Sequence, residues 1–149
     1  MSIVTKLTLM RSFGVSCKRY FNFKTVIMRE IDKSIDNFAL RKNDSFTVDY
    51  EKALNQKKCL INAFEKLGLC TVNLPSDGHA DSTFIEDTAV IIDNTALITN
   101  PGAVSRRAEV HRVREYLSSL KRFYMPSWDI SDGYLDGGDV LFTGPKLFL

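Results

Sequence analysis

The chain contains two copies of a short apolar pattern, and this repeat constrains its fold more than any other feature. In each copy an aspartate opens an apolar strand, a short turn and a second apolar strand. Asp87 precedes TAVIIDNTALI, and Asp139 precedes VLFTGPKLFL, 52 residues later. A period of about 20–50 residues or slightly more indicates stacked or radial modules, none of which buries its apolar face alone. Two modules leave open sheet edges, which a closed ring removes, so the sequence predicts an α/β fold with further modules.

The first half of the chain alternates strand, helix and strand. The β-branched run 23–28 predicts a buried strand. Asp49 is suited to cap a helix, and Gly68 lies just past the expected end of that helix. Its expected inward stripe consists of Ala53, Leu54, Ile61, Phe64 and Leu67. A second short strand is expected at 69–74.

The second half repeats this alternation. The apolar runs 89–92 and 95–98 flank Asp93-Asn94, a two-residue loop that tolerates positive φ and therefore predicts a hairpin. Ser105 is the expected cap of a second helix. The apolar face of that helix is made of Val110, Val113, Leu117 and Leu120. The remaining expected elements are a strand near 122–125, the glycine-rich segment 135–139 and a last apolar segment.

Charge divides the chain into a leader and a body. Residues 1–29 hold six basic side chains and no acid, whereas the rest holds 14 basic and 18 acidic ones, a net charge of −4. A mildly acidic body argues against a nucleic-acid surface. Residues 1–22 suit an organelle-import leader, and the alternatives are a disordered extension or a wrongly chosen start codon. We expect residues 23–149 to form the folded domain, in the cytoplasm or, with a genuine leader, in mitochondria, and not secreted.

The cysteines and the hydropathy pattern exclude several classes of protein. Cys17, Cys59 and Cys70 form no even disulfide framework and no zinc-ligand spacing, so a reducing compartment is expected. Cys59 and Cys70 lie in apolar segments and are expected to be inert. The two histidines, His79 and His111, are expected to be structural or exposed. No stretch approaches the roughly 18–20 consecutive apolar residues that a membrane span requires.

Three carboxylates fall within seven positions, at Asp81, Glu86 and Asp87. The last two lie where a loop turns into a strand, so both face one pocket only if the backbone bends there. Clustered carboxylates bind a hard cation, share a proton in acid-base catalysis, or pair with a guanidinium or ammonium group. A solvated acidic loop is the fourth interpretation, and the residues by themselves leave all four open.

Two arginines, Arg106 and Arg107, follow Ser105 at the expected start of a helix, where the helix dipole disfavours cations. A bound anion would explain them, because the free N–H groups of a helix start and an arginine fork make a carboxylate receptor. The alternative is a surface pair that bonds to an upstream acid. The later motif LDGGD, at 135–139, combines two acids with two glycines that permit close backbone approach.

Taken together, the motifs FIEDTAV, ALITNPGAVSRR and LDGGDVLFTG, with FALR at 38–41, resemble dimethylarginine dimethylaminohydrolase, a family of the guanidino-group-modifying α/β-propeller (pentein) superfamily. The resemblance runs from about residue 24 to the end, and the motifs are specific in this order and at these distances. It implies a propeller of repeated ββαβ modules, about two of roughly five being present. Asn100 departs from the family, which often has arginine before Pro-Gly.

The resemblance implies hydrolysis of N-methylated arginines to citrulline and methylamine or dimethylamine, without a metal or organic cofactor. A cysteine attacks the guanidinium carbon, a histidine shuttles protons, and water hydrolyses the covalent intermediate. In the family, that histidine, the nucleophilic cysteine and a second carboxylate-binding arginine come later than the position matching Leu149. We therefore expect these 149 residues to be the amino-terminal part of such an enzyme and to be inactive alone.

The resemblance also implies roles for residues of this chain. The acids that look like those holding the guanidinium and the amino-acid end of the substrate are Asp81, Glu86 and Asp87. Arg106 resembles the arginine that grips the substrate α-carboxylate. Leu40 matches a position that contacts the substrate through its backbone, and Asp136 resembles the acid that orients the catalytic histidine.

Two other hypotheses stay open. In one, the chain is a non-catalytic binder of arginine analogues or a regulatory partner of a full-length copy, and its last apolar strand pairs with another sheet edge in self-association. In the other, the chain is a carboxylate-metal hydrolase. The acids of that second hypothesis are Asp81, Glu86, Asp87 and Asp139. The leading hypothesis expects a small-molecule partner, with neither nucleic acid nor membrane.

Overall fold

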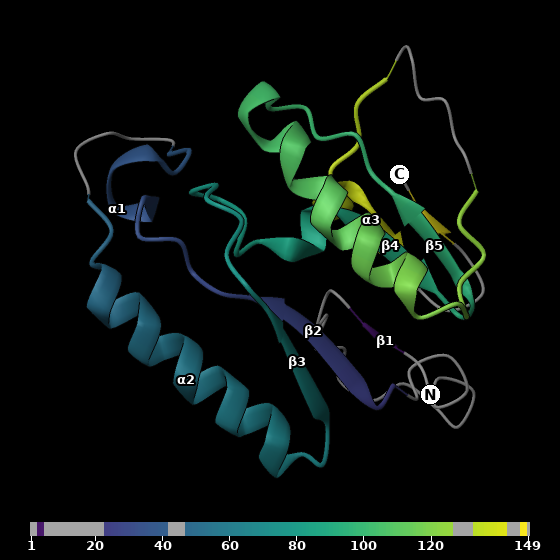
Figure 1. Cartoon of the computed structure of the whole chain (residues 1–149), viewed down its shortest axis with the longest axis horizontal. Coiled ribbons are helices and arrows are strands. Elements are labelled where there is room, and N and C mark those ends of the chain that lie inside the picture. The colour runs from purple at the N-terminus through teal and green to yellow at the C-terminus, as the bar shows by residue number, and fades with distance from the viewer. Residues whose placement is uncertain (1–2, 5–22, 42–46, 127–132, 143–146, 149) are drawn as a thin grey trace.

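The computed structural model describes residues 3–4, 23–41, 47–126, 133–142 and 147–148, and these contain three small sheets and three α-helices (Figure 1). The strands are β1 (Ile3–Val4), β2 (Thr25–Arg29), β3 (Cys70–Leu74), β4 (Ala89–Ile92), β5 (Thr95–Ile98), β6 (Leu141–Phe142) and β7 (Leu147–Phe148). The helices are α1 (Ile35–Phe38), α2 (Tyr50–Lys66) and α3 (Val110–Ser119).

The first unit is the crossover from β2 through α2 to β3. β2 pairs in parallel with β3 and also with β1, which gives the order β1-β2-β3. All five residues of β2 are buried, and successive side chains point to opposite faces of the sheet. Val26 and Met28 pack against Phe64 of α2, whereas Ile27 packs into the core beneath α3. The predicted strand at 23–28 is confirmed within two residues.

The start of α2 also follows the prediction. The Asp49 side chain accepts a hydrogen bond from the Lys52 N–H at 2.9 Å, and Gly68 follows the helix end with φ of +76°. Phe64 is buried, but Leu67 is 72% exposed, so the last position of the expected inward stripe is wrong. Leu67 is the C-cap residue, where the regular helix has ended and the chain turns toward β3.

The second unit contains the β4–β5 hairpin, α3 and a short return to β5. The hairpin has the predicted strands and a turn in which Asp93 has φ of +51°. After α3, Tyr124 forms a single parallel bridge to Thr95 of β5, so the strand expected near 122–125 is reduced to one bridge. The buried core of this unit includes Ile27 from β2 and consists otherwise of Ile85, Ala89, Ala96, Ile98, Val110, Val113 and Leu117. Its connectivity resembles that of the first unit.

The predicted start of the second helix at Ser105 is wrong. The chain forms a 3₁₀ segment at Val104–Glu109, α3 begins only at Val110, and the Ser105 side chain makes no capping hydrogen bond. The reason lies in Arg106 and Glu109, both buried. A 3₁₀ helix has three residues per turn, so positions i and i+3 lie on the same side and these two side chains meet inside the protein.

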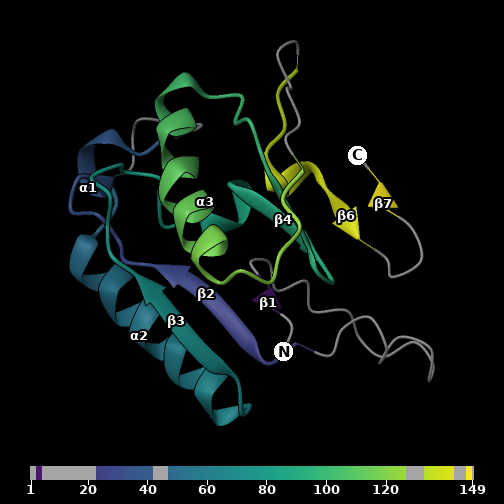
Figure 2. The same cartoon turned by 45° about the vertical axis from the view of Figure 1, so that its right-hand side comes forward.

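The repeat that begins at Asp87 and again at Asp139 is visible in the structure. A 3₁₀ turn at Ile85–Asp87 precedes the β4–β5 hairpin, and a 3₁₀ turn at Gly137–Asp139 precedes the antiparallel β6–β7 pair. Figure 2 shows β6 and β7 on the far side of the β4–β5 hairpin from α2. Among the described residues the sheets do not close into a ring. The leader predicted at 1–22 lies outside the described residues, apart from β1.

Candidate ligand-binding site

The six predicted site residues lie on four segments that the structure brings together. The N–H of Leu40 reaches Asp81, Arg106 reaches Asp87, and the turn that begins with Asp136 packs on the segment 85–87. The term acid–arginine cluster is used below for Leu40, Asp81, Glu86, Asp87, Arg106 and Asp136. Residues almost a hundred positions apart in the sequence therefore share one region.

The bend required for two adjacent acids to share a site is present. Glu86 and Asp87 belong to the 3₁₀ turn Ile85–Asp87 rather than to β4, which starts two residues later at Ala89. Ile85 is buried and fixes the turn to the core, while both acids remain partly exposed. Because neither acid lies in a strand, their side chains need not point to opposite faces of a sheet.

Arg106 is the centre of the cluster. Its Nη1 donates to the Asp87 carboxylate at 2.7 Å, and its Nη2 donates to the backbone carbonyls of Asp81 and Phe84 at 3.2 and 3.1 Å. Its Nε and Nη2 both donate to Glu109, at 3.2 and 2.9 Å. Arg106 was expected at a helix start as an anion receptor or at the surface beside an upstream acid. It does bond to an upstream acid, but from a buried position.

Glu109 is a buried partner of Arg106 that the sequence reasoning missed. Its side chain is 1% exposed, and burial raises the pKa of its carboxyl group against the attraction of Arg106. Burial also opposes the charge of Arg106, but hydrogen bonds to Glu109 and Asp87 outweigh that cost and raise the pKa of the guanidinium. Spacing by three positions in the sequence was the signal available, because residues i and i+3 lie on the same side of a helical segment.

Asp81 holds the segment after α1. Its side chain is buried, and its two oxygens accept the Leu40 N–H at 3.2 and 3.0 Å. The N–H of Leu40 is therefore engaged inside the chain, whereas its side chain is 58% exposed. Asp81 thus links the segment after α1 to the acid–arginine cluster.

The glycines of the motif at 135–139 permit close packing on the acidic turn. A Cβ atom on Gly137 would overlap the backbone carbonyl of Glu86, and one on Gly138 would lie 2.9 Å from Asp87 Oδ1. The Gly138 N–H instead donates to that oxygen at 3.1 Å. Asp136 begins this turn and forms a reciprocal capping box with Asp139. Gly137 is required because backbone meets backbone here, and Gly138 leaves room for the Asp87 carboxylate.

The metal hypothesis gains no support from this arrangement. The carboxylates of Asp81, Asp87 and Asp139 accept hydrogen bonds from backbone N–H groups or from Arg106. Within the described ranges, no three acids, histidines or cysteines are grouped as ligands of a metal ion.

Asn100 and Arg107 hold the segment that leads to the glycine motif. The Asn100 amide donates to the Gly133 carbonyl at 2.8 Å, and its backbone bridges to Leu135. The guanidinium of Arg107 lies 4.4 Å from the centre of the Tyr134 ring and donates to the Pro101 carbonyl. Arg107 therefore supports a neighbouring segment, while Arg106 enters the cluster.

The histidines and the described cysteines lie outside this cluster's hydrogen bonds. His79 Nδ1 is 3.2 Å from Asp77, whose other oxygen pairs with the fully buried Arg29. His111 is exposed on α3, as predicted. Cys59 and Cys70 are free and exposed, although both were expected in apolar segments. Cys17 lies outside the described residues.

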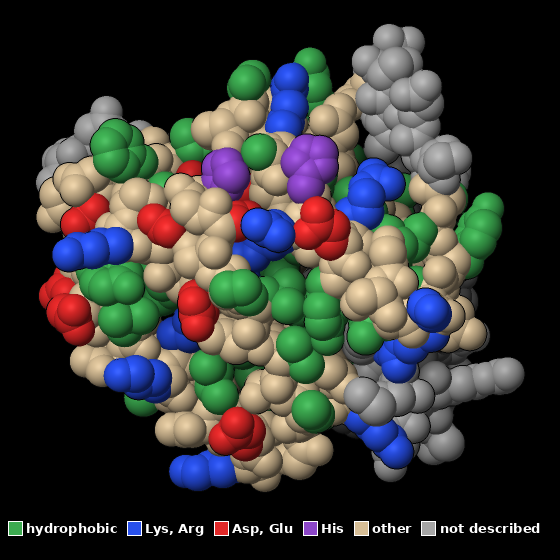
Figure 3. Space-filling view, viewed as in Figure 1, with side chains coloured by type: hydrophobic (Ala, Val, Ile, Leu, Met, Phe, Trp, Pro, Cys, Tyr) green, Lys and Arg blue, Asp and Glu red, His purple; other side chains and the backbone are tan. Residues whose placement is uncertain are grey.

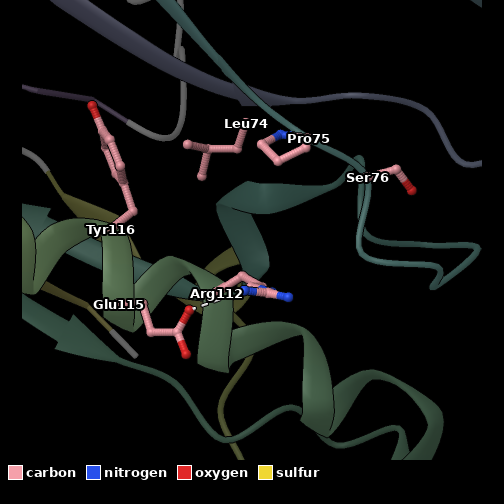
Figure 4. A pocket seen from close by; sticks show the side chains of 6 residues that line it. All are labelled: Leu74, Pro75, Ser76, Arg112, Glu115 and Tyr116. Atoms are coloured by element: carbon pink, nitrogen blue, oxygen red, sulfur yellow. Dashed lines mark hydrogen bonds and ion pairs between the residues drawn. The ribbon is translucent and has the colours of Figure 1, made fainter.

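A hollow of about 420 Å³ lies between the end of β3 and α3, away from the acid–arginine cluster (Figure 4). It is lined by Leu74, Pro75, Ser76, Arg112, Glu115 and Tyr116. In the space-filling view, hydrophobic side chains gather along the middle of the face that Figure 3 shows. The hollow lies where the two units meet, and none of the predicted site residues lines it.

Sequence comparison relates the chain to curated hydrolases. It is 41% identical over 103 residues to the N(G),N(G)-dimethylarginine dimethylaminohydrolase of Streptomyces coelicolor and 31% identical over 130 residues to that of Pseudomonas aeruginosa. These alignments cover 68% and 85% of this chain but 39% and 50% of the relatives. The chain therefore spans about half the length of the curated relatives it matches, or less. No protein-family model matches it.

Solved structures agree with this relation. A histidine-to-glycine variant of dimethylarginine dimethylaminohydrolase, as an adduct with S-methyl-L-thiocitrulline, has a TM-score of 0.75 at 29% identity and covers 84% of this chain. The Pseudomonas aeruginosa enzyme, as a cysteine-to-serine variant complexed with citrulline, has a TM-score of 0.76, also at 29% identity. In both pairs the chain covers 49% of the solved structure. A cyanobacterial arginine dihydrolase domain, 15% identical with a TM-score of 0.69, shares the fold.

Proposed function

Because this chain is a dimethylarginine dimethylaminohydrolase-like member of the pentein fold, we propose that it supplies the substrate-recognition part of a methylarginine hydrolase. The whole enzyme converts dimethylarginine or monomethylarginine to citrulline plus dimethylamine or methylamine. The observation that carries this proposal is the acid–arginine cluster. In it Arg106 joins the turn bearing Asp87 to the segment bearing Asp81.

The charges of the cluster suit a cationic amino acid. Arg106 carries one positive charge among several carboxylates, so the site has an excess of negative charge that attracts a guanidinium group. Within the described residues, Arg106 Nη1 donates one hydrogen bond, to Asp87, and has a second hydrogen for a substrate carboxylate. Glu86 and Asp87 then bind the guanidinium, while Leu40 contacts the substrate through its carbonyl group.

The catalytic groups of the proposed enzyme are a cysteine and a histidine. Cys70 stands at the start of β3, whereas the acids follow the opposite end of that strand, and Cys59 is exposed on α2. Neither cysteine therefore serves as the nucleophile. Asp136 is proposed to orient a histidine that these residues do not supply. Two related structures, one with a replaced histidine and one with a replaced cysteine, support this assignment of the chemistry.

The proposal extends to the architecture and the cellular setting. The two repeated units are proposed to be about two of roughly five ββαβ modules of a propeller, with residues 23–149 as its first part. Residues 1–22 are proposed to be a leader or extension, which makes the location mitochondrial or cytoplasmic. No helix in the described part of the chain has the length and apolar character to cross a membrane.

Calorimetric titration with L-arginine, dimethylarginine and citrulline tests the recognition proposal. We expect the chain to bind the two cationic ligands more tightly than citrulline, which has no charged guanidinium. Glu86→Gln should weaken cation binding about tenfold, because a charge-assisted hydrogen bond is lost. The matched control is Asp93→Asn in the exposed β4–β5 turn, which should bind normally. Equal affinity for citrulline and arginine would contradict the proposal.

The second candidate function is a non-catalytic binder of arginine analogues. The observation that favours it is that the contacts of the acid–arginine cluster lie within these residues. Incubation with dimethylarginine, followed by a citrulline assay, should give no product from the chain alone, and citrulline above background would refute the predicted inactivity. Sedimentation then tests the predicted self-association of the final strand.

A further inference from the structure

Lys57 is a half-buried lysine on an otherwise exposed part of α2, and its ammonium group reaches the base of the acidic segment. Its Nζ donates to the backbone carbonyl of Arg29 at the end of β2 and to Thr83 Oγ1, the latter at 3.1 Å. The Thr83 hydroxyl also donates to the Arg29 carbonyl, at 3.4 Å. One side chain therefore ties α2, β2 and the segment 81–87 together.

The charges around Lys57 come from two of these elements. Burial lowers the pKa of the ammonium group to about 8, against the attraction of Glu30 beside β2 and Glu86 on the acidic turn, and the nearby Arg29 lowers it further. An exposed lysine would avoid this cost. The neighbouring Lys58 is exposed. The chain therefore keeps a costly charge at a helical position from which the side chain reaches the acidic segment.

We propose that Lys57 is a positioning residue that holds the segment 81–87, and with it the acids of the ligand site, against β2 and α2. Thr83, its direct partner, lies between Asp81 and Glu86 in the sequence, so a shift of Thr83 moves both acids. The inference rests on the proposed function for its ligand. The position of the segment itself does not depend on that function.

Hydrogen exchange and calorimetry on the whole 149-residue chain test this inference. The variants are Lys57→Met, which keeps the length but removes the charge and donors, Lys57→Arg, which keeps both, and the control Lys58→Met. We expect amide exchange in 81–87 to rise about tenfold in Lys57→Met, to recover partly in Lys57→Arg and to stay unchanged in the control. The affinity for L-arginine should fall about tenfold in Lys57→Met alone.

The pH dependence of amide exchange distinguishes a positioning role of the Lys57 ammonium group from a contribution of its side chain to packing alone. In the unmodified chain, exchange in 81–87, corrected for its intrinsic pH dependence, should fall between pH 8 and 10.5, because a lysine whose pKa is lowered in the closed structure stabilises that structure as it loses its proton, whereas Lys57→Met should show no such fall. Unchanged exchange in Lys57→Met overturns the inference, whatever the ligand result. A chain that binds no arginine, yet shows the expected exchange, overturns the proposed function and leaves Lys57 in its positioning role. A Lys57→Met chain that unfolds is replaced by Lys57→Gln.

Discussion

The two crossover units share one connectivity but differ in how their helices begin and pack. α2 starts at the exposed cap Asp49 and buries only Phe64, whereas α3 follows the 3₁₀ segment Val104–Glu109, in which Arg106 and Glu109 are buried. α3 buries Val110, Val113 and Leu117. Figure 1 shows α2 on the outer side of the β2–β3 sheet and α3 over the β4–β5 hairpin. α2 is therefore stabilised mainly by its local capping contacts and α3 by tertiary contacts. Four predictions test this difference.

The largest effect is expected from the buried charges at the start of α3. Arg106→Met leaves the carboxylates of Asp87 and Glu109 without their partner, which costs about 3–5 kcal/mol for a broken buried ion pair. Urea denaturation of the variant measures the loss. The control is Arg112→Met, because Arg112 pairs with Glu115 at the exposed surface and should change stability by about 0.5 kcal/mol or less. Equal losses in the two variants would show that Arg106 is not a structural centre.

The next effect concerns the apolar faces of the helices. Leu117→Ala removes a side chain with 0% exposure from the core and should lower the free energy of unfolding by about 3 kcal/mol. Leu67→Ala makes the same chemical change where the side chain is 72% exposed, and should cost about 0.5 kcal/mol or less. Thermal and urea denaturation of both variants measure these two changes in the free energy of unfolding. A large loss at Leu67 would place the end of α2 in a core.

A smaller effect is expected at the two positions that the sequence suggested as helix caps. Asp49→Ala should cost about 1 kcal/mol, because the Asp49 side chain accepts the Lys52 N–H. Ser105→Ala should have no measurable effect, because Ser105 makes no capping bond. Urea denaturation curves of the two variants, measured in parallel, provide the comparison. A cost at Ser105 equal to that at Asp49 would mean that both helices start in the same way.

The smallest effect is the pH dependence contributed by Lys57, because its partial exposure lets solvent screen the charge. The pKa of Lys57 is about 8 in the folded chain, below the ordinary value of 10.5, so the unfolded chain binds more protons between these values. The free energy of unfolding should therefore rise with pH in this window. Urea denaturation at pH 7.5 and 10 should show this rise diminished in Lys57→Met. An identical rise would assign it to other groups.

Local patterns explain why much of the fold followed from the sequence. The β4–β5 hairpin was predicted because Asp93-Asn94 tolerates positive φ between two apolar runs. α2 was predicted because its cap and its terminal glycine stand beside the two helix ends in the sequence. The predicted acids and Arg106 do converge, but their roles in binding and catalysis stay predictions. Ser105 was misjudged because a favourable cap residue was outweighed by burial of Arg106.

The sequence by itself determined the repeat, the strands β2 to β5 and the helix α2 near their observed ends, and the candidate residues, because these depend on contacts between near neighbours in the chain. Only the tertiary structure decided that Arg106 is shared between Asp87 and Glu109, and that Lys57 supports Thr83. Those pairings join segments up to 26 positions apart. Their energy depends on removing charges from water, and no local pattern specifies which charges the folded chain will bury.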